Sequence, residues 1–325
     1  MNKKISKAAA AKLLLSQNRI MIIGHANPDG DALGSCFALY HALSALGKRV
    51  CVVNSDKITP KYCFLSGGKS ILKPQFQPDF VVSVDVGTPK LFGASLMEYA
   101  DKVDLNIDHH PSNPYFGKYN VVDAKAAAAG EIMLDIIEAM KVDIDGDIAS
   151  ALYTAISTDT ACFMHNSTTA TTLRKAAKLV DLGADINYLN THLFVKKSWE
   201  QFELESAAVK SVRFFRKKTI AVMVISLALM EQTGADADDT DGIATLPRKI
   251  EGVDVGITMR EVSPNVYKIS ARSDGNVNVS EVCQRLGGGG HVRAAGCTLE
   301  GDVDSVVKRI VDEVMVEYHS IEEVV

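Results

Sequence analysis

The sequence predicts an α/β protein of two domains, an N-terminal one with a mostly parallel sheet flanked by helices and a smaller C-terminal α/β one with a mixed sheet. Three observations lead to this prediction. The chain has 325 residues, which suggests about two domains of ordinary size. Its first half alternates short apolar runs with helical patterns. After about residue 210, strand-like runs become dominant again.

The composition narrows the class of protein. Hydrophobic residues make up 47% and charged residues 23%, a balance that excludes a disordered chain. The formal net charge of -5 excludes a global basic field for long DNA, although a local cationic pocket for a short nucleotide is compatible with it. The six cysteines contain no Cys-x-x-Cys pair, which indicates buried thiols in a reducing compartment. Since no apolar run reaches about 18 residues, we expect a cytoplasmic protein without a membrane span.

In the N-terminal domain the strand candidates are short apolar runs. The first is 19–24, and after a loop the helical pattern of 32–46 follows it. Further strand candidates lie at 49–54, 80–86 and 103–107. Later candidate helices lie at 125–140, 146–157, 168–182 and 198–209. Strands joined by crossovers predict a parallel sheet, and we expect this domain to span 1–188, followed by a helical linker at 189–209.

The C-terminal domain is expected to span 210–325. Its strand candidates are 212–215, 219–225, 253–261 and 266–272. Its helix candidates are 226–230, 238–249 and 303–317. The last two strand candidates are joined by Ser263-Pro264-Asn265, a turn sequence that predicts a hairpin.

Ionisable residues follow three of the N-terminal strand candidates. In a parallel sheet the carboxyl ends of the strands meet at one edge, where ligands bind, so we expect these side chains to lie close together. One further carboxylate, Asp159, follows a largely apolar helix candidate. The complete set is His25, Asp29, Asp31, Asp85, Asp108, His109, His110 and Asp159.

Two interpretations of this set compete. Asp-rich turns are common, and Asp31 could simply cap the helix that follows it. However, charges at the ends of several buried strands are costly without compensation, and two divalent cations would supply it. Mixed carboxylate and imidazole ligands suit Mn²⁺, and the lack of Cys among them argues against a thiolate-rich zinc site. We therefore favour a two-metal site.

These residues, in this order, resemble the four motifs of the DHH phosphoesterase superfamily. The C-terminal domain agrees, because 286–296 resembles the glycine-rich signature of the DHH-associated domain. The run 266–273, which contains Arg272, resembles the strand that precedes that signature. The resemblance spans about 15 to 315, essentially the whole chain.

The resemblance implies a site with two Mn²⁺ ions, or Co²⁺ or Mg²⁺ in their place. It implies that the first ion is held by His25, Asp29 and Asp85. It implies that the second is held by Asp31, Asp85, His109 and Asp159, so that Asp85 bridges both ions. His110 is implied to contact the scissile phosphate, and Asp108 to be its catalytic partner by orienting an imidazole.

The resemblance also implies a substrate-binding set. Asn27 in the first loop is expected to contact substrate. The glycines Gly287, Gly288, Gly289 and Gly290 let backbone amides approach an anion, and Arg272 and His291 add charged donors. A tight turn or hairpin tip is the alternative for the glycine run. The active-site cleft is expected between the two domains.

Among two-domain members of this length, the chain resembles most the nanoRNase/pAp phosphatase (NrnA-like) group. That resemblance implies an oligoribonuclease that hydrolyses short RNA and pApA to nucleoside monophosphates, and 3′-phosphoadenosine 5′-phosphate (pAp) to AMP. A cyclic di-AMP phosphodiesterase, a manganese-dependent inorganic pyrophosphatase and a non-enzymatic nucleotide sensor on a DHH scaffold remain alternatives. We expect short RNA or a small nucleotide as partner, and neither long DNA nor a membrane; a homodimer is compatible with the sequence.

Overall fold

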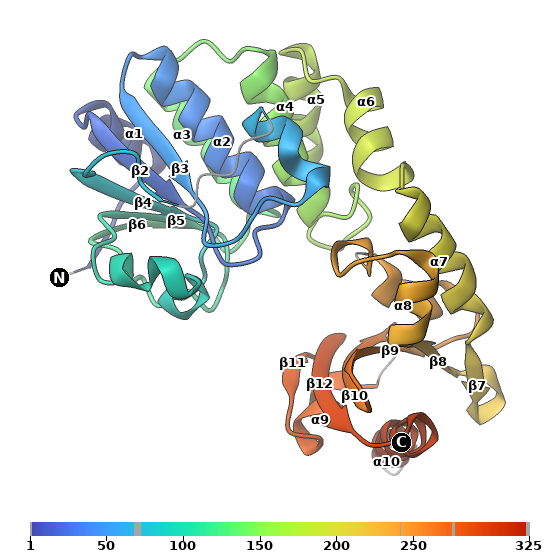
Figure 1. Ribbon diagram of the computed structural model, residues 1–325. Helices are drawn as coiled ribbons and strands as arrows, with labels where there is room; N and C mark the ends of the chain where they lie inside the picture. Colours follow the sequence, from blue (N-terminus) through green and yellow to red (C-terminus); the bar gives the residue numbers. More distant parts are fainter. Residues whose placement is uncertain (1, 68–72, 241, 275–276, 323–325) are drawn as a thin grey trace. The chain divides into compact units, whose positions relative to one another are not determined.

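The computed structural model describes residues 2–67, 73–240, 242–274 and 277–322 (Figure 1). The chain divides into two compact units, Met1–Lys196 and Lys197–Val325, which we call unit 1 and unit 2. This boundary lies inside 189–209, the range that the sequence predicts as a linker. The finer domain limits at 188 and 210 stay a prediction.

Unit 1 is built on sheet A, to which the described residues contribute six strands, all paired in parallel. The strand order is β1-β6-β5-β4-β2-β3. The strands are β1 (Lys3–Lys4), β2 (Arg19–Ile23), β3 (Arg49–Val53), β4 (Phe80–Val84), β5 (Leu105–Asp108) and β6 (Tyr119–Val122). The central strands are almost wholly buried, which explains why they read as continuous apolar runs rather than as alternating ones. The predicted parallel sheet is confirmed.

Helices and short 3₁₀ segments cover the two faces of sheet A (Figure 1). Ile20 and Ile22 of β2 face a core shared with the long helices, whereas Met21 and Ile23 face a smaller core closed by the short segments. The helices of unit 1 are α1 (Lys7–Leu15), α2 (Gly30–Ala45), α3 (Ala129–Met140), α4 (Gly146–Asp159), α5 (Ala170–Asp181) and α6 (Ile186–Asn190). The short segments are η1 (Pro60–Ser66), η2 (Pro89–Leu91), η3 (Ala94–Tyr99) and the π-helical η4 (Thr191–Val195). Gly34 allows α2 to touch α4, since a Cβ there would lie 2.4 Å from the Ala151 carbonyl oxygen.

Unit 2 is built on sheet B, with the order β11-β12-β10-β9-β8-β7 in the described part of the chain. Its strands are β7 (Arg213–Phe215), β8 (Ile220–Ile225), β9 (Val255–Ser263), β10 (Val266–Ser273), β11 (Gly289–His291) and β12 (Ala294–Glu300). Only the β8–β9 pair is parallel among these strands, so the predicted mixed sheet is confirmed.

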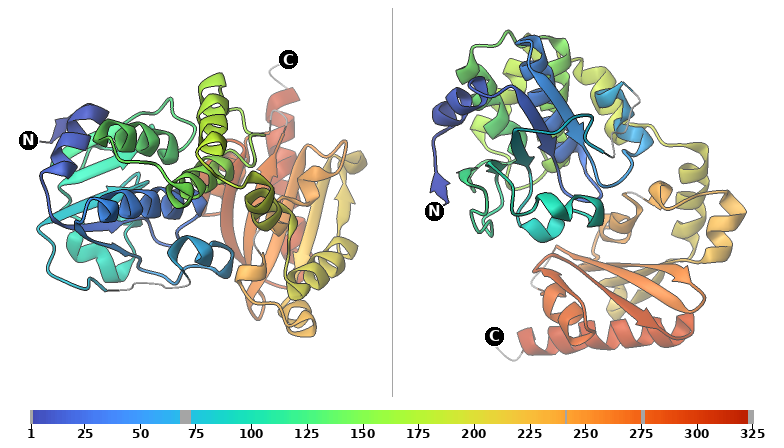
Figure 2. Two further views of the ribbon diagram at one scale, coloured as in Figure 1. Left: turned by 90° about the horizontal axis from the view of Figure 1, so that it is seen from above. Right: turned by 60° about the vertical axis from the view of Figure 1, so that its left-hand side comes forward.

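One face of sheet B packs on α9 (Val279–Arg285) and α10 (Val303–Glu322), and Figure 2 shows α10 running along this face. On the other face, α7 (Trp199–Lys210) and α8 (Leu227–Thr233) pack over the end of the sheet near β8. Among the described residues no α-helix covers this face over β10, β12 and β11, although the short 3₁₀ segment η7 (Ile243–Thr245) contacts β9 and β10 there. No helix that the structure describes is both long and apolar enough to cross a membrane.

One predicted element of unit 2 is wrong. The helix expected over 238–249 consists, where described, of three short 3₁₀ helices, η6 (Asp238–Thr240), η7 (Ile243–Thr245) and η8 (Pro247–Lys249). Gly242 has a φ of 75°, a left-handed conformation that interrupts a helix, and Pro247 cannot donate a backbone hydrogen bond. A remaining 3₁₀ segment is η5 (Arg216–Lys218). The glycine run also differs from a simple loop, because Gly289 and Gly290 belong to β11.

Candidate active site

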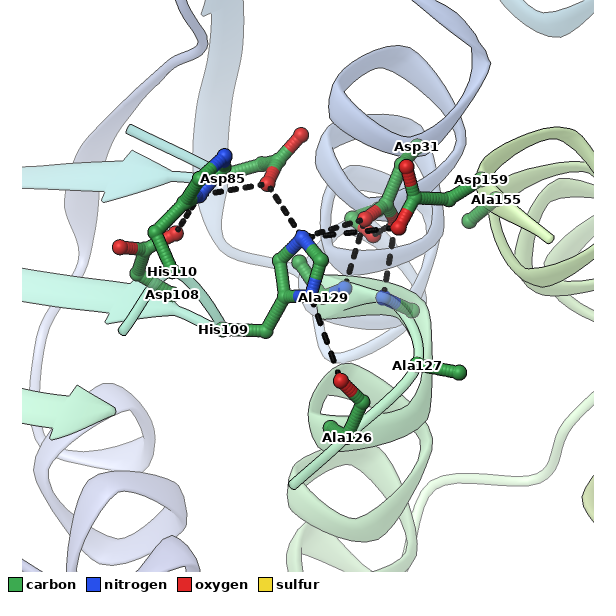
Figure 3. A network of polar contacts seen from close by, with 12 residues as sticks. Asp31, Asp85, Asp108, His109, His110, Ala126, Ala127, Ala129, Ala155 and Asp159 are labelled. Carbon is green, nitrogen blue, oxygen red and sulfur yellow. Dashed lines mark hydrogen bonds and ion pairs between the residues drawn. The ribbon is translucent and has the colours of Figure 1, made fainter. Parts of the chain in front are cut away.

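The carboxyl edge of sheet A brings the predicted ionisable residues together. Figure 3 shows the part of this set formed by Asp31, Asp85, Asp108, His109, His110 and Asp159. His25 follows β2, Asp85 follows β4 and His109 follows β5. Asp31 lies in the first turn of α2, and Asp159 is the last residue of α4. In the described part of the chain, three groups have donor atoms within 4.8 Å of one another: His25, Asp29 and Asp85; Asp31, His109 and Asp159; and Asp85, His109 and His110.

Asp85 lies between His25 and His109. Its Oδ2 is 3.7 Å from His25 Nε2, and its Oδ1 is 3.5 Å from His109 Nε2. His109 Nε2 is also 3.6 Å from an oxygen of Asp159 and 3.8 Å from one of Asp31. These distances exceed those of hydrogen bonds, so the donors converge without bonding to one another. Such spacing leaves room for an ion between them.

The orientation of both histidines favours a cation. His25 Nδ1 is 2.8 Å from the Ala26 carbonyl oxygen. His109 Nδ1 is 3.3 Å from the carbonyl oxygen of Ala126, a contact that Figure 3 shows. A carbonyl oxygen only accepts, so Nδ1 carries the proton in each ring. In the neutral imidazole the Nε2 lone pair then points at carboxylate oxygens, an unfavourable arrangement that a metal ion would reverse.

The buried carboxylates fit the same conclusion. Asp85 is 3% exposed, and its buried Oδ1 has no hydrogen-bond partner among the residues described. Burial and the nearby carboxylates of Asp29 and Asp108 raise the pKa of Asp85 well above its usual range. Burial and the carboxylates of Asp85 and Asp159 do the same to the pKa of Asp31. Since burial and like charges without a counter-ion cause these shifts, the carboxylate and imidazole set fits divalent cations such as Mn²⁺.

Asp31 does not cap its own helix. Asp29 is the N-cap of α2, and its Oδ1 accepts hydrogen bonds of 3.0 Å from the N–H groups of Asp31 and Ala32. Asp31 instead accepts from the first N–H groups of α3, from Ala129 at 2.6 Å and from Gly130 at 2.9 Å. The N-cap of α3 is an alanine without a capping side chain, so Asp31 satisfies donors that are otherwise orphaned. These bonds fix the carboxylate in the site.

A second buried network orients His110. Its Nδ1 is 2.8 Å from Asp108 Oδ1, and Asp108 is fully buried. Asn113 donates from Nδ2 to Asp108 Oδ2 at 2.5 Å and to Asn106 Oδ1 at 2.9 Å. Although burial raises it, these hydrogen bonds hold the pKa of Asp108 below its usual range. Asn113 is not among the residues predicted from the sequence. The signal that points to it is its position three residues after His110, following Pro111-Ser112.

Backbone strain marks the same edge. Asp85 has a φ of 58° and Asn27 one of 50°, in the left-handed region that non-glycine residues rarely adopt. The backbone N–H of Asn27 donates to Asp56 at 3.0 Å, and the residue is exposed. A substrate contact of Asn27 stays a prediction.

The other predicted substrate-binding residues lie in unit 2. Ala294 of β12 pairs with His291 of β11 on one side and with Arg272 of β10 on the other. Directly paired residues project from the same face of a sheet, so His291 and Arg272 flank the small side chain of Ala294. Gly288 must be glycine, because a Cβ there would lie 2.1 Å from the Gly296 carbonyl oxygen. The binding role of these residues stays a prediction.

Comparison with known proteins agrees with this architecture. The family described as "DHH family, N-terminal domain" matches residues 19–156, and the DHHA1 domain matches 216–316. The bifunctional oligoribonuclease and PAP phosphatase NrnA of Thermus thermophilus is 33% identical over 314 residues, which cover 95% of this chain and 93% of that protein. A protein of the same name from Mycoplasma pneumoniae is 27% identical over 312 residues, 94% of this chain and 95% of that protein.

Solved structures share the fold. The crystal structure of an exopolyphosphatase-related protein from Bacteroides fragilis has a TM-score of 0.86 at 23% identity, over 95% of both chains. RecJ of Thermus thermophilus in complex with Mn²⁺ has a TM-score of 0.54 at 14% identity, over 97% of this chain and 55% of RecJ.

The fold and the matches together define a hydrolytic phosphoesterase. The chain belongs to the DHH family, in its two-domain form with a DHHA1 domain, and resembles the oligoribonucleases and PAP phosphatases of the NrnA group.

Proposed function

We propose that this chain is a Mn²⁺-dependent phosphoesterase that hydrolyses short oligoribonucleotides and dinucleotides such as pApA to nucleoside monophosphates, and pAp to AMP. The observation that supports it most is the position of Asp85, whose two oxygens face two separate groups of metal-type donors. The relatives named oligoribonuclease and PAP phosphatase suggest the substrate class.

In this proposal one ion is held by His25, Asp29 and Asp85. The other is held by Asp31, Asp85, His109 and Asp159. When bound, a pair of such ions lowers the pKa of a water molecule and polarises the phosphoryl oxygens. The protein's own contribution is to hold these ligands in place, through the α3 N–H groups at Asp31 and the carbonyl groups at the two histidines.

His110 is the residue proposed to act on the phosphate directly. Asp108 engages Nδ1, so the ring is fixed and its other nitrogen is available to a phosphoryl or leaving-group oxygen. The side chain is 41% exposed, whereas Asp108 behind it is fully buried. Asp108 therefore orients the imidazole and does not meet the substrate itself.

Unit 2 is proposed to bind the remainder of the nucleotide. Arg272 and His291 offer cationic donors, and the run Gly287 to Gly290 offers backbone amides to an anion. Binding through a few local contacts needs no long basic track, which favours substrates of about two to five nucleotides over long strands.

A competition assay between pApA and a 24-nucleotide RNA tests this function. With Mn²⁺ the dinucleotide should be consumed first, and EDTA should abolish the reaction because the ions organise it. Equal or faster loss of the 24-mer would contradict the proposal and indicate a processive exonuclease. Parallel reactions with cyclic di-AMP and pyrophosphate test the two enzymatic alternatives, and nucleotide binding without any hydrolysis would identify a sensor.

A further inference from the structure

The open face of sheet B carries one row of paired residues across four strands. His291 pairs with Ala294, Ala294 with Arg272, and Arg272 with Gly256 of β9. All four therefore share one face. Ile257 and Ala271, their chain neighbours, point the other way, into the core with α9 and α10. The row thus places His291 and Arg272 on the face opposite that core.

Arg248 packs against Gly256, the residue at one end of this row. A Cβ on Gly256 would lie 2.5 Å from the backbone nitrogen of Arg248 and 3.0 Å from its Cα and Cβ. The absent side chain of Gly256 therefore leaves the space in which η8 packs on β9. Because Gly256 is the direct partner of Arg272, the two arginines lie on the same face.

The guanidinium groups of Arg248 and Arg272 have more hydrogen-bond donors than acceptors around them among the described residues. Burial lowers the pKa of the Arg272 guanidinium, and the positive charge of Arg248 lowers it further. The buried Nε of Arg248 has no hydrogen-bond partner in the described part of the chain. Arg248 does form an ion pair with Asp274, which follows β10, and Arg272 donates to the backbone oxygen of Ala271 at 2.9 Å. A guanidinium has five N–H donors, so both arginines retain donors for a further acceptor.

We propose that Arg248 is a further substrate-binding residue, which together with Arg272 binds a terminal phosphate monoester of the nucleotide. This inference rests on the proposed function, because that function supplies the nucleotide. Phosphate fits the observations, since guanidinium groups bind it through paired hydrogen bonds and its charge relieves the repulsion between two arginines. Asp274 competes with the phosphate for Arg248, so binding requires this ion pair to exchange.

The neighbouring row of paired residues on the same face is formed by small residues, which leave space for a nucleotide beside the arginines. Gly296 pairs with Gly289 on one side and with Ser270 on the other. These residues project little or nothing above the sheet, whereas Arg272 and His291 stand in the adjacent row. A sugar and base can therefore approach the backbone while their phosphate reaches the guanidinium groups.

The test compares Arg248→Gln with Lys249→Gln, an exposed neighbour that loses the same charge, in the full-length chain with Mn²⁺. The substrates are ApA, 5′-pApA and ApAp. For Arg248→Gln we expect KM to rise about tenfold for one phosphorylated dinucleotide, and kcat, metal content and the KM for ApA to stay unchanged. The dinucleotide whose KM rises shows whether Arg248 binds the 5′ or the 3′ phosphate. Lys249→Gln should leave all three KM values unchanged.

Two further variants keep the test decisive if Arg248→Gln folds poorly. Arg248→Lys retains the charge but loses the planar fork, and should give an intermediate KM. Asp274→Asn removes the competing carboxylate and should lower KM for the same phosphorylated substrate. The inference is overturned if Arg248→Gln or Arg248→Lys behaves like Lys249→Gln, or if KM for ApA rises equally.

A binding measurement separates this inference from the proposed function. Calorimetry of AMP and of adenosine with the EDTA-treated full chain needs no hydrolysis. The wild type should bind AMP more tightly than adenosine, and Arg248→Gln should lose that preference. If the wild type hydrolyses no dinucleotide but shows the preference, only the proposed function fails. If it hydrolyses dinucleotides and Arg248→Gln keeps the preference, only the role of Arg248 fails.

Discussion

The carboxyl edge of sheet A is rich in carboxylates, two of which are almost fully buried, whereas the open face of sheet B is partly exposed and carries cationic side chains. Asp31 and Asp85 are 1% and 3% exposed, whereas Arg248 and Arg272 are only half-buried and His291 is exposed. A resident cation can compensate buried charges permanently, so its ligands can be buried. A substrate anion must enter and leave, so its donors need access to solvent. The difference in burial therefore matches the ligands proposed for the two regions, a resident cation and an exchanging anion.

The two regions also fix their side chains differently. At the edge of sheet A, backbone and side-chain hydrogen bonds hold several of the side chains, as the α3 N–H groups hold Asp31 and as Asp108 holds His110. On sheet B, strand register and glycine fix the row: Gly256 admits Arg248, and Ala294 separates Arg272 from His291. Variants in the first region should therefore change metal content and turnover, and variants in the second should change KM.

The largest effect is expected from Asp85→Asn, which removes the charge shared by both donor groups. We expect loss of bound metal and a fall in kcat of at least about 10³-fold, because each ion supplies several kcal/mol of transition-state stabilisation. Metal analysis by mass spectrometry and hydrolysis of pApA measure the two effects. Asp101→Asn, at an exposed aspartate, is the matched control. Two ions per chain in Asp85→Asn would contradict the bridging role.

His109→Ala and His110→Ala should separate metal binding from turnover. His109 Nε2 faces three carboxylates, so its loss should remove one ion. His110 is held by Asp108 instead, so its loss should leave the metal content intact and lower kcat by about 10²–10³-fold, as removal of a charge-stabilising donor does. Metal counts of the two purified variants would reveal a reversed assignment.

Arg272→Ala and His291→Ala probe the opposite region. Each should raise KM for pApA, for Arg272 by about 10- to 100-fold, since a hydrogen bond between charged groups is lost. Metal content and kcat should stay close to those of the wild type. Arg293→Ala, at the exposed turn between β11 and β12, is the matched control. A loss of metal in either variant would break the separation between the two regions.

Metal addition should stabilise the protein more at pH 7.5 than at pH 5. The raised pKa values of Asp31 and Asp85 mean that the metal-free folded state holds protons that the unfolded chain releases above about pH 4. The free energy of unfolding therefore falls as pH rises through those pKa values, and bound cations remove this loss. At a Mn²⁺ concentration 100 times Kd, the gain is about 2.7 kcal/mol, or roughly 5–10 °C in Tm.

Scanning calorimetry at both pH values, with and without Mn²⁺, measures this difference. In Asp85→Asn the Mn²⁺ effect itself should largely disappear at both pH values, because this variant is expected to lose its bound metal. Equal Tm shifts at both pH values in the wild type would contradict the electrostatic explanation.

The sequence predicted the residues of the carboxyl edge because their positions follow from simple rules. Apolar runs identify β2, β4 and β5, and parallel strands present their carboxyl ends together, so His25, Asp85 and His109 had to meet. The strands β1 and β6 were missed because both are short: β6 has only four residues, and β1 is only Lys3–Lys4, which pairs through its backbone without any hydrophobic pattern.

Other features depend on packing that no local pattern encodes. The exchange of caps, in which Asp29 caps α2 and Asp31 caps α3, joins segments 98 residues apart. The place of Arg248 follows from the register that sets Gly256 opposite Arg272. Asn113 lies only five residues after Asp108, yet their hydrogen bond depends on the turn between them, which brings the two side chains together.

Asn113→Ala is expected to have the smallest effect on kcat among these variants. It tests whether Asn113 positions His110 through Asp108. Asn113→Ala leaves the buried Asp108 without its amide donor, which should lower the free energy of unfolding by about 1–3 kcal/mol. If Asn113 also positions His110 through Asp108, kcat should fall about tenfold at unchanged KM and metal content. Asn113→Gln keeps an amide and should restore part of kcat. Lower stability with unchanged kcat would limit Asn113 to a structural role. A raised KM would contradict the division in which the carboxyl edge of sheet A sets turnover and the open face of sheet B sets KM.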